Sequence, residues 1–150
     1  MGKTNKGFVE EGLRIYLDRM KHYGRFEWLE LPDVRNGSKL SHGLLKESEA
    51  AEFLKHVERP GLLILMDEKG KTFSSAELAE RFVAYQNRAV KCVNLLIGGA
   101  YGFSERLSAD ADEKWSLSRM TFSHQMVRMI LAEQLYRSQT IIKGESYHHE

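Results

Sequence analysis

The segment from residue 92 to residue 102 reads Cys92-Val93-Asn94-Leu95-Leu96-Ile97-Gly98-Gly99-Ala100-Tyr101-Gly102. Its first half is a short continuous apolar run, which is typical of a parallel strand buried on both faces. Glycines follow this run at once, and α/β sheets bind their ligands there, beyond the carboxyl ends of the strands. The glycines do not spell the GxGxxG fingerprint of dinucleotide-binding folds. By itself the turn therefore fits either a ligand site or a plain tight turn.

A second apolar run, Leu62-Leu63-Ile64-Leu65-Met66, predicts another buried parallel strand. Between the two runs, Ser74 and Glu77 have the spacing of a capping box, which opens a helix running to about Arg88. The order strand, helix, strand predicts an α/β fold, with a mainly parallel sheet and helices on both faces. Apolar periodicity and turn residues further predict helices at residues 8–23, 44–57 and 123–139, a strand at 26–31 and a turn at 67–70.

Length and composition limit the classes of protein that the chain can belong to. A chain of 150 residues predicts one domain over residues 1–150, and the net charge of +1 does not by itself indicate nucleic-acid binding. Cys92 is the only cysteine, which excludes a disulfide framework and a CxxC metal site. No apolar stretch reaches the length of a membrane span and no signal peptide opens the chain, so we expect a cytoplasmic protein.

The segment Gly70-Lys71-Thr72 resembles the end of a phosphate-binding P-loop. That motif requires a glycine where this chain has Leu65, so we do not expect an NTPase. In the tail, residues 143–150 lack the apolar content to dock by themselves, and chain ends of this kind normally fray. His148 and His149 have no acidic or cysteine partner at ligand spacing, so we expect no metal site there.

Four blocks of sequence carry a resemblance to a known family. They are Leu96-Ile97-Gly98-Gly99-Ala100-Tyr101-Gly102, Leu117-Ser118-Arg119-Met120-Thr121-Phe122-Ser123-His124-Gln125, Glu133-Gln134-Leu135-Tyr136-Arg137 and Gly144-Glu145-Ser146-Tyr147-His148-His149. In order and spacing they resemble the bacterial large-subunit (23S) rRNA pseudouridine N3-methyltransferase family of the SPOUT class. The resemblance extends over nearly the whole chain. It implies an α/β domain with a trefoil knot near the carboxyl end, which residue patterns alone could not predict because knots are almost absent among folds.

The resemblance also implies a reaction: methyl transfer from S-adenosyl-L-methionine to ring nitrogen N3 of a pseudouridine in large-subunit rRNA. The assembled ribosome is favoured over bare RNA as the substrate. The implied cofactor contacts lie in the knot loops and are Met66, Gly98, Leu117, Ser118, Arg119, Met120, Thr121 and Phe122. Without the resemblance, Leu117, Met120 and Phe122 would be interpreted as core residues. No metal is needed for a displacement of this kind, in which positioning contributes most.

The target nitrogen carries an imide proton that must leave, so a base within hydrogen-bond reach would help. The candidates for base, anion stabiliser or RNA contact are His124, Arg137, Tyr147 and His148. Arg137 fits equally well an ion pair with Glu133, four residues earlier on the same helix. His124 fits equally well a packing role at the helix start. The resemblance further implies a homodimer through helix 123–139, which would cover Met126 and Met129.

Three departures from the family pattern stand out. Members usually open with a short hydrophobic strand before the Gly-Lys-Thr motif, whereas here Met1 directly precedes Gly2-Lys3-Thr4. We expect either that the start is assigned too late or that the sheet lacks this strand. Arg119 and Ser123 stand where lysine and proline are common. A SPOUT enzyme acting on tRNA, a non-catalytic ribosome-binding protein and a small-molecule enzyme are the alternatives, and the four blocks argue against each of them.

Overall fold

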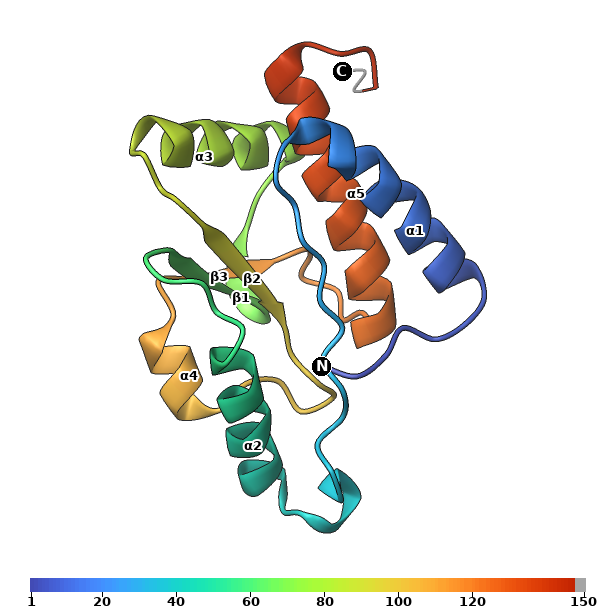
Figure 1. Ribbon diagram of the computed structural model, residues 1–150, viewed down its shortest axis with the longest axis vertical. Coiled ribbons are helices and arrows are strands. Elements are labelled where there is room, and N and C mark those ends of the chain that lie inside the picture. The colour runs from blue at the N-terminus through green and yellow to red at the C-terminus, as the bar shows by residue number, and fades with distance from the viewer. Residues whose placement is uncertain (148–150) are drawn as a thin grey trace. The chain divides into compact units, whose positions relative to one another are not determined.

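The computed structural model describes residues 1–147 (Figure 1). In chain order the elements are α1 (Phe8–Met20), the 3-10 helices η1 (Lys21–Tyr23) and η2 (Gly37–Lys39), α2 (His42–Leu54), β1 (Leu62–Thr72), α3 (Ser75–Asn87), β2 (Val93–Ile97), α4 (Glu105–Asp110), β3 (Glu113–Ser116) and α5 (His124–Lys143). The chain groups into two compact units. The sheet unit contains Met1–Lys3, Glu30–Thr72 and Lys91–His124, and the helical unit contains Thr4–Leu29, Phe73–Val90 and the described residues from Gln125 onward.

The sheet unit is built on three parallel strands in the order β2-β1-β3. Leu63, Ile64 and Leu65 of the central strand are fully buried, as expected for an apolar run in a parallel strand. Phe53 of α2 and Leu107 of α4 belong to the same apolar core as Leu63 and Leu65. The predicted α/β fold with a parallel sheet is therefore confirmed, and so are the strands predicted at residues 62–66 and 92–97.

The central strand β1 extends beyond the predicted strand. The prediction of a turn at residues 67–70 is wrong, because β1 continues to Thr72. Its pairing with β3 shifts register after Met66, so that Met66 and Lys71 both pair with Trp115. A Cβ atom on Gly70 would lie only 2.6 Å from backbone atoms of Lys114 and Trp115. The two strand backbones are in contact at Gly70, and glycine leaves room for that approach.

Three further differences from the sequence predictions have simple physical reasons. Residues 26–31 form no strand; Leu31 is buried and its carbonyl accepts a 2.9 Å hydrogen bond from the Gly2 amide, but no ladder of such bonds forms. β3 was not predicted, because its four residues show no apolar alternation around Trp115. α4 was not predicted either, because its six residues are too few for helical periodicity to show.

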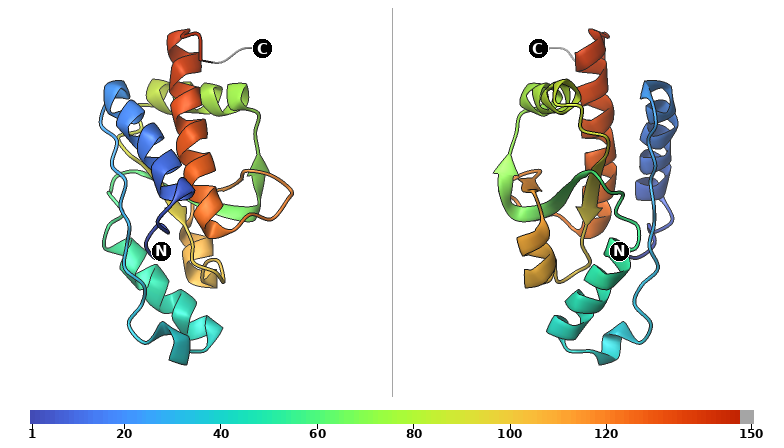
Figure 2. Two further views of the ribbon diagram at one scale, coloured as in Figure 1. Left: turned by 90° about the vertical axis from the view of Figure 1, so that its right-hand side faces the viewer. Right: turned by 60° about the vertical axis from the view of Figure 1, so that its left-hand side comes forward.

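The helical unit confirms the helix predictions closely. Residues 8–23 form α1 and η1, and α5 extends the predicted helix 123–139 to Lys143. The capping box is present, with Ser74 Oγ accepting from the Glu77 amide and the Glu77 side chain accepting from the Ser74 amide. α1 and α5 lie side by side in the views of Figures 1 and 2. None of the described helices is both long and apolar enough to cross a membrane.

Candidate functional site

The predicted cofactor residues meet at one edge of the sheet unit. Met66 pairs with Ile97 in β2 and with Trp115 in β3, so these positions lie at one level across the three strands. Gly98 directly follows Ile97, and the loop of residues 117–122 directly follows β3. Gly98 and that loop therefore follow the carboxyl ends of β2 and β3, at the level of Met66 in the longer strand β1 between them. The carboxyl ends of parallel strands are the usual ligand position in α/β folds.

The glycine turn after β2 depends on its glycines. Gly102 has a φ of +72°, in the left-handed region that favours glycine, and its amide donates a 3.1 Å hydrogen bond to the Gly99 carbonyl. Gly98 is buried, and a Cβ atom there would lie 3.3 Å from Phe103 Cζ and 3.4 Å from the Gly102 backbone. The turn thus closes on itself, and a larger side chain at Gly98 would force it open.

A carboxylate that the sequence analysis did not single out supports this turn. Glu49 of α2 is only 8% exposed and accepts a hydrogen bond from the Gly99 backbone amide. A Cβ atom on Gly99 would lie 2.6 Å from Glu49 Oε1, so this glycine allows the close approach. Burial raises the pKa of the Glu49 carboxyl above its ordinary value of 4.5; the amino group of Met1 and the Gly99 amide oppose the rise, and Asp33 adds to it.

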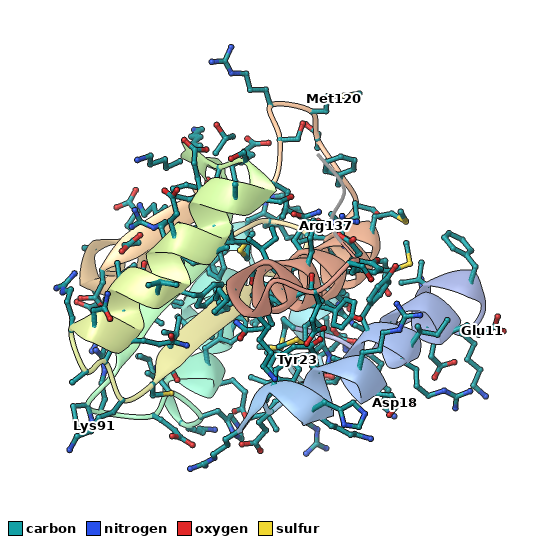
Figure 3. The ribbon with its side chains drawn as sticks, turned by 90° about the horizontal axis from the view of Figure 1, so that it is seen from above. Glu11, Asp18, Tyr23, Lys91, Met120 and Arg137 are labelled. Carbon is teal, nitrogen blue, oxygen red and sulfur yellow. The ribbon has the colours of Figure 1, made fainter. Side chains whose placement is uncertain are left out.

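The loop after β3 presents apolar side chains to solvent. Met120 is 73% exposed and lies at the outer end of the loop (Figure 3), and Phe122 is 38% exposed. The alternative of core packing is therefore wrong for both residues, and Leu117 is half-buried. Ser118 orders the loop: its carbonyl accepts from Ser116 Oγ at 2.7 Å and its Oγ accepts from the Met120 amide at 3.0 Å. Arg119 and Thr121 are exposed.

The chemistry of these residues suits a ligand with a flat aromatic ring. Gly98 adds no side chain at the strand edge, and backbone groups at neighbouring strand ends supply hydrogen bonds. Exposed apolar groups such as Met120 and Phe122 are suited to cover a flat aromatic ring. The described residues hold no group of three or more His, Cys, Asp or Glu side chains that could bind a metal ion.

A second constellation lies in the helical unit, where tyrosines from both ends of the chain gather. The Tyr136 and Tyr147 rings pack edge to face, with centroids 4.8 Å apart, and Tyr16 lies 6.0 Å from Tyr136. The hydroxyls of Tyr16 and Tyr147 are 3.3 Å apart. The expectation that the tail frays is thus wrong for Tyr147, because ring contacts and hydroxyl hydrogen bonds hold it where apolar content alone would not.

Glu133 organises the predicted catalytic residues of this unit. Its Oε1 accepts from Arg137 Nη2 at 2.5 Å and Nε at 2.9 Å, and from the Tyr147 hydroxyl at 3.2 Å. The Arg137 guanidinium also lies 4.7 Å from the Tyr147 ring centre. The ion pair foreseen as an alternative role for Arg137 is therefore present, and the same contacts place Arg137 beside Tyr147.

The protonation states of this pair follow from their surroundings. The hydrogen bond to Glu133 raises the pKa of Arg137, so the guanidinium stays charged. Burial first, and then the hydrogen bond with Tyr16 and the charge of Glu133, raise the pKa of the Tyr147 phenol. Neither group is suited to remove a proton near neutral pH. Tyr147 can donate a hydrogen bond, and Arg137 can stabilise an anion.

The other two predicted catalytic residues are placed differently. His124 is the first residue of α5, thirteen positions before Arg137 on the same helix, so the two are not neighbours. His148 lies outside the described residues. The sequence analysis missed Arg19, whose guanidinium lies over the rings of Tyr16, Tyr136 and Tyr147 at 5.6, 5.3 and 5.8 Å. The spacing of Tyr16 and Arg19, three residues apart on one helix face, was the available signal.

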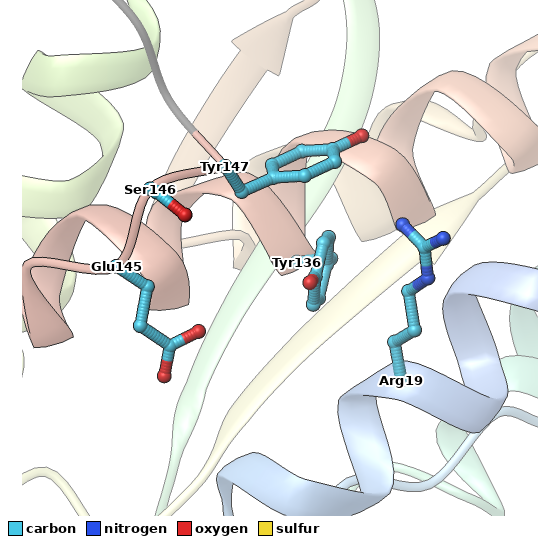
Figure 4. A pocket seen from close by; sticks show the side chains of 5 residues that line it. All are labelled: Arg19, Tyr136, Glu145, Ser146 and Tyr147. Atoms are coloured by element: carbon cyan, nitrogen blue, oxygen red, sulfur yellow. The ribbon is translucent and has the colours of Figure 1, made fainter.

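The helical unit also contains a cavity of about 590 Å³ beside these rings. Figure 4 shows the five side chains that line it, with Arg19 and Glu145 on opposite sides of Tyr136; they are Arg19, Tyr136, Glu145, Ser146 and Tyr147. Glu145 accepts a hydrogen bond from the Tyr23 hydroxyl. The lining of the cavity therefore combines a cation, an anion and aromatic rings.

Comparison with known proteins yields a consistent set of matches. A family model described as "Predicted SPOUT methyltransferase" matches residues 1–148. The chain is 44% identical over 149 residues to the "Ribosomal RNA large subunit methyltransferase H" of Christiangramia forsetii, covering 99% of this chain and 95% of that protein. Proteins with the same name from Cytophaga hutchinsonii and Geotalea daltonii are 46% and 42% identical, with 99% of this chain and 96% and 95% of the relatives covered.

Proposed function

The chain belongs to the SPOUT methyltransferase family, and from this premise we propose that it methylates large-subunit rRNA with S-adenosyl-L-methionine as the methyl donor. The observation that carries the proposal is the meeting of Met66, Gly98 and the 117–122 loop at one edge of the parallel sheet. The relatives' name supports rRNA as the substrate. The family resemblance supports N3 of a pseudouridine as the target atom and the assembled ribosome as its context.

The cofactor site that we propose contains Met66, Gly98, Leu117, Ser118, Arg119, Met120, Thr121 and Phe122. When bound, S-adenosyl-L-methionine supplies an electrophilic methyl group on a sulfonium. The task of the protein is then to hold donor and acceptor in line, which is worth several kcal/mol when the geometry is right. The buried Gly98 turn, supported by Glu49, fixes the backbone that faces the cofactor.

We propose that four residues have separate roles at the base that accepts the methyl group: Arg137, Tyr147, His124 and His148. Loss of the imide proton leaves negative charge on the uracil ring, and the Arg137 cation can stabilise it. Tyr147, kept neutral by its surroundings, can donate a hydrogen bond or stack on a base. The general base is then one of the two histidines, because imidazole is the side chain most often used as a general base.

We also propose the fuller architecture that the family implies. It is a single SPOUT domain over residues 1–150, with helices on both faces of the sheet and a trefoil knot in the carboxyl-terminal third. Membership of the SPOUT family supports the knot. The cytoplasm is the proposed location because ribosomes are found there.

A homodimer through α5 completes the proposal. Part of the apolar surface expected to form this interface is already used within the chain: a Cβ atom on Gly12 of α1 would lie 2.5 Å from Met129 Sδ. Phe8 and Ile15 of α1 are 69% and 51% exposed, which leaves apolar area for a second copy. Light scattering should give two protomer masses at micromolar concentration. A single protomer mass there would contradict the dimer.

The experiment that tests the function measures methyl transfer and cofactor binding together. Mass spectrometry of rRNA from unmethylated ribosomes, incubated with the protein and S-adenosyl-L-methionine, should show one added methyl on a pseudouridine. Gly98→Val should weaken cofactor binding in calorimetry by about 100-fold, or 2.7 kcal/mol, by opening the turn. Ala100→Val, which also ends in a valine side chain but at an exposed position of that turn, should bind normally.

Three outcomes would contradict the proposal or its cofactor site. If the wild-type protein binds ribosomes but not S-adenosyl-L-methionine, it is a non-catalytic ribosome-binding protein. If the methyl appears on tRNA and not on rRNA, the enzyme is a related SPOUT methyltransferase with a different substrate. Normal cofactor affinity in Gly98→Val would remove the cofactor from this turn.

A further inference from the structure

Arg19 has unusual surroundings for an exposed arginine. Its guanidinium lies within 6 Å of the ring centres of Tyr16, Tyr136 and Tyr147. Two other cations of the helical unit are neutralised: Lys21 forms a 2.6 Å ion pair with Asp18, and Arg137 is paired with Glu133. No carboxylate of the residues that the structure describes forms an ion pair with Arg19. Among the described residues its charge is therefore uncompensated, and the rings hold the guanidinium in place.

An arginine held in this way is prepared to bind an anion. Contacts with ring faces limit the motion of the guanidinium, so less entropy is lost when its N–H groups bind a ligand. The guanidinium carries five N–H donors in a planar fork that matches the oxygens of a phosphate. It also lies on the wall of the cavity of about 590 Å³, a size that suits small-molecule ligands.

The other walls of the cavity narrow the class of ligand. Tyr136 and Tyr147 offer aromatic surface beside Arg19, which suits a nucleobase. Glu145 and Ser146 lie on the far side (Figure 4) and supply oxygen acceptors, which suit the hydroxyl of a ribose. An acid at that end disfavours a ligand that is anionic throughout. A nucleotide has an anionic phosphate for Arg19, a base for the tyrosine rings and sugar hydroxyl donors for Glu145 and Ser146.

We propose that this cavity binds one unstacked nucleotide of the RNA substrate, with the phosphate on Arg19, the base against Tyr136 and Tyr147, and the ribose toward Glu145 and Ser146. The proposal rests on the proposed function for its choice of RNA over other nucleotide-containing ligands. It makes Arg19 a substrate-binding residue on α1.

The test compares two arginines of the same helix. Arg19→Ala removes the cavity cation, and Arg14→Ala removes an exposed cation of α1 that does not line the cavity. Each variant is assayed for single-turnover methylation of unmethylated ribosomes over a range of ribosome concentrations. Arg19→Ala should raise the half-saturating concentration by about 10- to 100-fold, as expected for lost charge-assisted hydrogen bonds. Arg14→Ala should change it by less than about twofold.

The salt dependence provides a second readout that a structural role would not move. Loss of one phosphate contact should lower the slope of log affinity against log salt by about 0.7 in Arg19→Ala, and Arg14→Ala should keep the wild-type slope. Arg19→Lys, which keeps the charge but not the planar fork, should lie between wild type and Arg19→Ala. S-adenosyl-L-methionine affinity should match wild type in all three variants, and Arg19→Ala should melt only slightly lower because it loses its ring contacts.

The proposal is wrong if Arg19→Ala and Arg14→Ala shift the half-saturating concentration equally. It is also wrong if Arg19→Ala lowers only the rate at saturating ribosome, because Arg19 would then act in the chemical step or in the fold. Failure of the proposed function looks different, since wild-type protein would then transfer no methyl group. In that case, binding of a short single-stranded uridine-rich RNA decides: equal affinity in wild type and Arg19→Ala would overturn the nucleotide site.

Discussion

The glycine turn of the sheet unit and the tyrosine cluster of the helical unit are built in opposite ways. The turn at residues 98–102 is made of backbone, and side chains are absent where the chain must approach itself. The cluster around Tyr147 is made of side chains, held by ring packing and by hydroxyl hydrogen bonds to Glu133 and Tyr16. Added side-chain atoms should therefore disrupt the backbone-built region, and removal of side-chain atoms should disrupt the tyrosine cluster.

The largest effect should come from adding one methyl group where the backbones touch. Gly70→Ala would place a Cβ atom 2.6 Å from the backbone of Lys114 and Trp115, which cannot move aside as a flexible side chain can. We expect a loss of about 3 kcal/mol in unfolding free energy, the upper end of ordinary overpacking. Urea unfolding followed by the fluorescence of the buried Trp115 measures it.

The matched control for this variant is Gly43→Ala. Gly43 lies in α2 with open space around its Cβ position, so alanine should be neutral there or stabilising by about 0.5 kcal/mol. If Gly70→Ala unfolds at the same urea concentration as wild type, the contact between β1 and β3 is looser than the structure indicates.

The second effect comes from removing a ring. Tyr147→Leu should lower methylation of ribosomes by about tenfold or more, because base stacking contributes about 1–3 kcal/mol. Tyr147→Phe keeps the ring and loses only the hydroxyl contacts with Tyr16 and Glu133, so its loss should be clearly smaller. Single-turnover kinetics on unmethylated ribosomes compares them. Equal losses would assign the role to the hydroxyl and not to the ring.

The smallest effect is expected at Glu49, a side chain that supports the backbone-built turn. Because burial raises its pKa in the folded state, the folded protein binds this proton more readily than the unfolded chain. The stability that the protonated carboxyl contributes is fully present below its ordinary value of 4.5 and is lost as pH rises through the raised folded pKa. Glu49→Gln should therefore melt slightly higher than wild type at neutral pH.

The pH series also supplies the control for Glu49. The advantage of Glu49→Gln should shrink as pH falls toward 4.5, while the amide oxygen still accepts from Gly99. Thermal melting at several pH values, read together with Asp33→Asn to remove the neighbouring acid, measures this. A variant that melts lower than wild type at neutral pH, with the deficit shrinking as pH falls, would show that the ionised carboxylate itself holds the turn.

The position of the glycine turn could be predicted from the sequence more fully than the tyrosine cluster could. Parallel strands place their carboxyl ends together, so Met66, Gly98 and residues 117–122 could be expected at one edge without knowledge of any contact. β3, the strand that sets the position of that loop, was still missed, because four residues carry no periodic signal. Glu49 was missed because its burial depends on the glycine turn, 50 residues away in the chain.

The tyrosine cluster could be predicted only in part. Arg137 and Glu133 are four residues apart on one helix, so their ion pair is a local event and was foreseen as an alternative. Tyr16 and Tyr147 are 131 residues apart, and nothing in either local sequence indicates the other. Arg19 shares this limitation in part, because Tyr16 lies on its own helix but Tyr136 and Tyr147 come from α5 and the tail, more than 100 residues later in the chain.

The strand pairing has a consequence for the time course of folding. β1 lies between β2 and β3, and its nearest-in-sequence pair joins Leu62 to Val93, 31 residues later, while its pairs with β3 begin at Ile64 and Glu113, 49 residues apart. Such a sheet has no hairpin from which folding can nucleate. Each pair of strands must first close a long loop, which costs chain entropy, before hydrogen bonds between the strands can offset that cost. Helices α1, α3 and α5 can form early from local contacts, so closure of the sheet sets the folding rate.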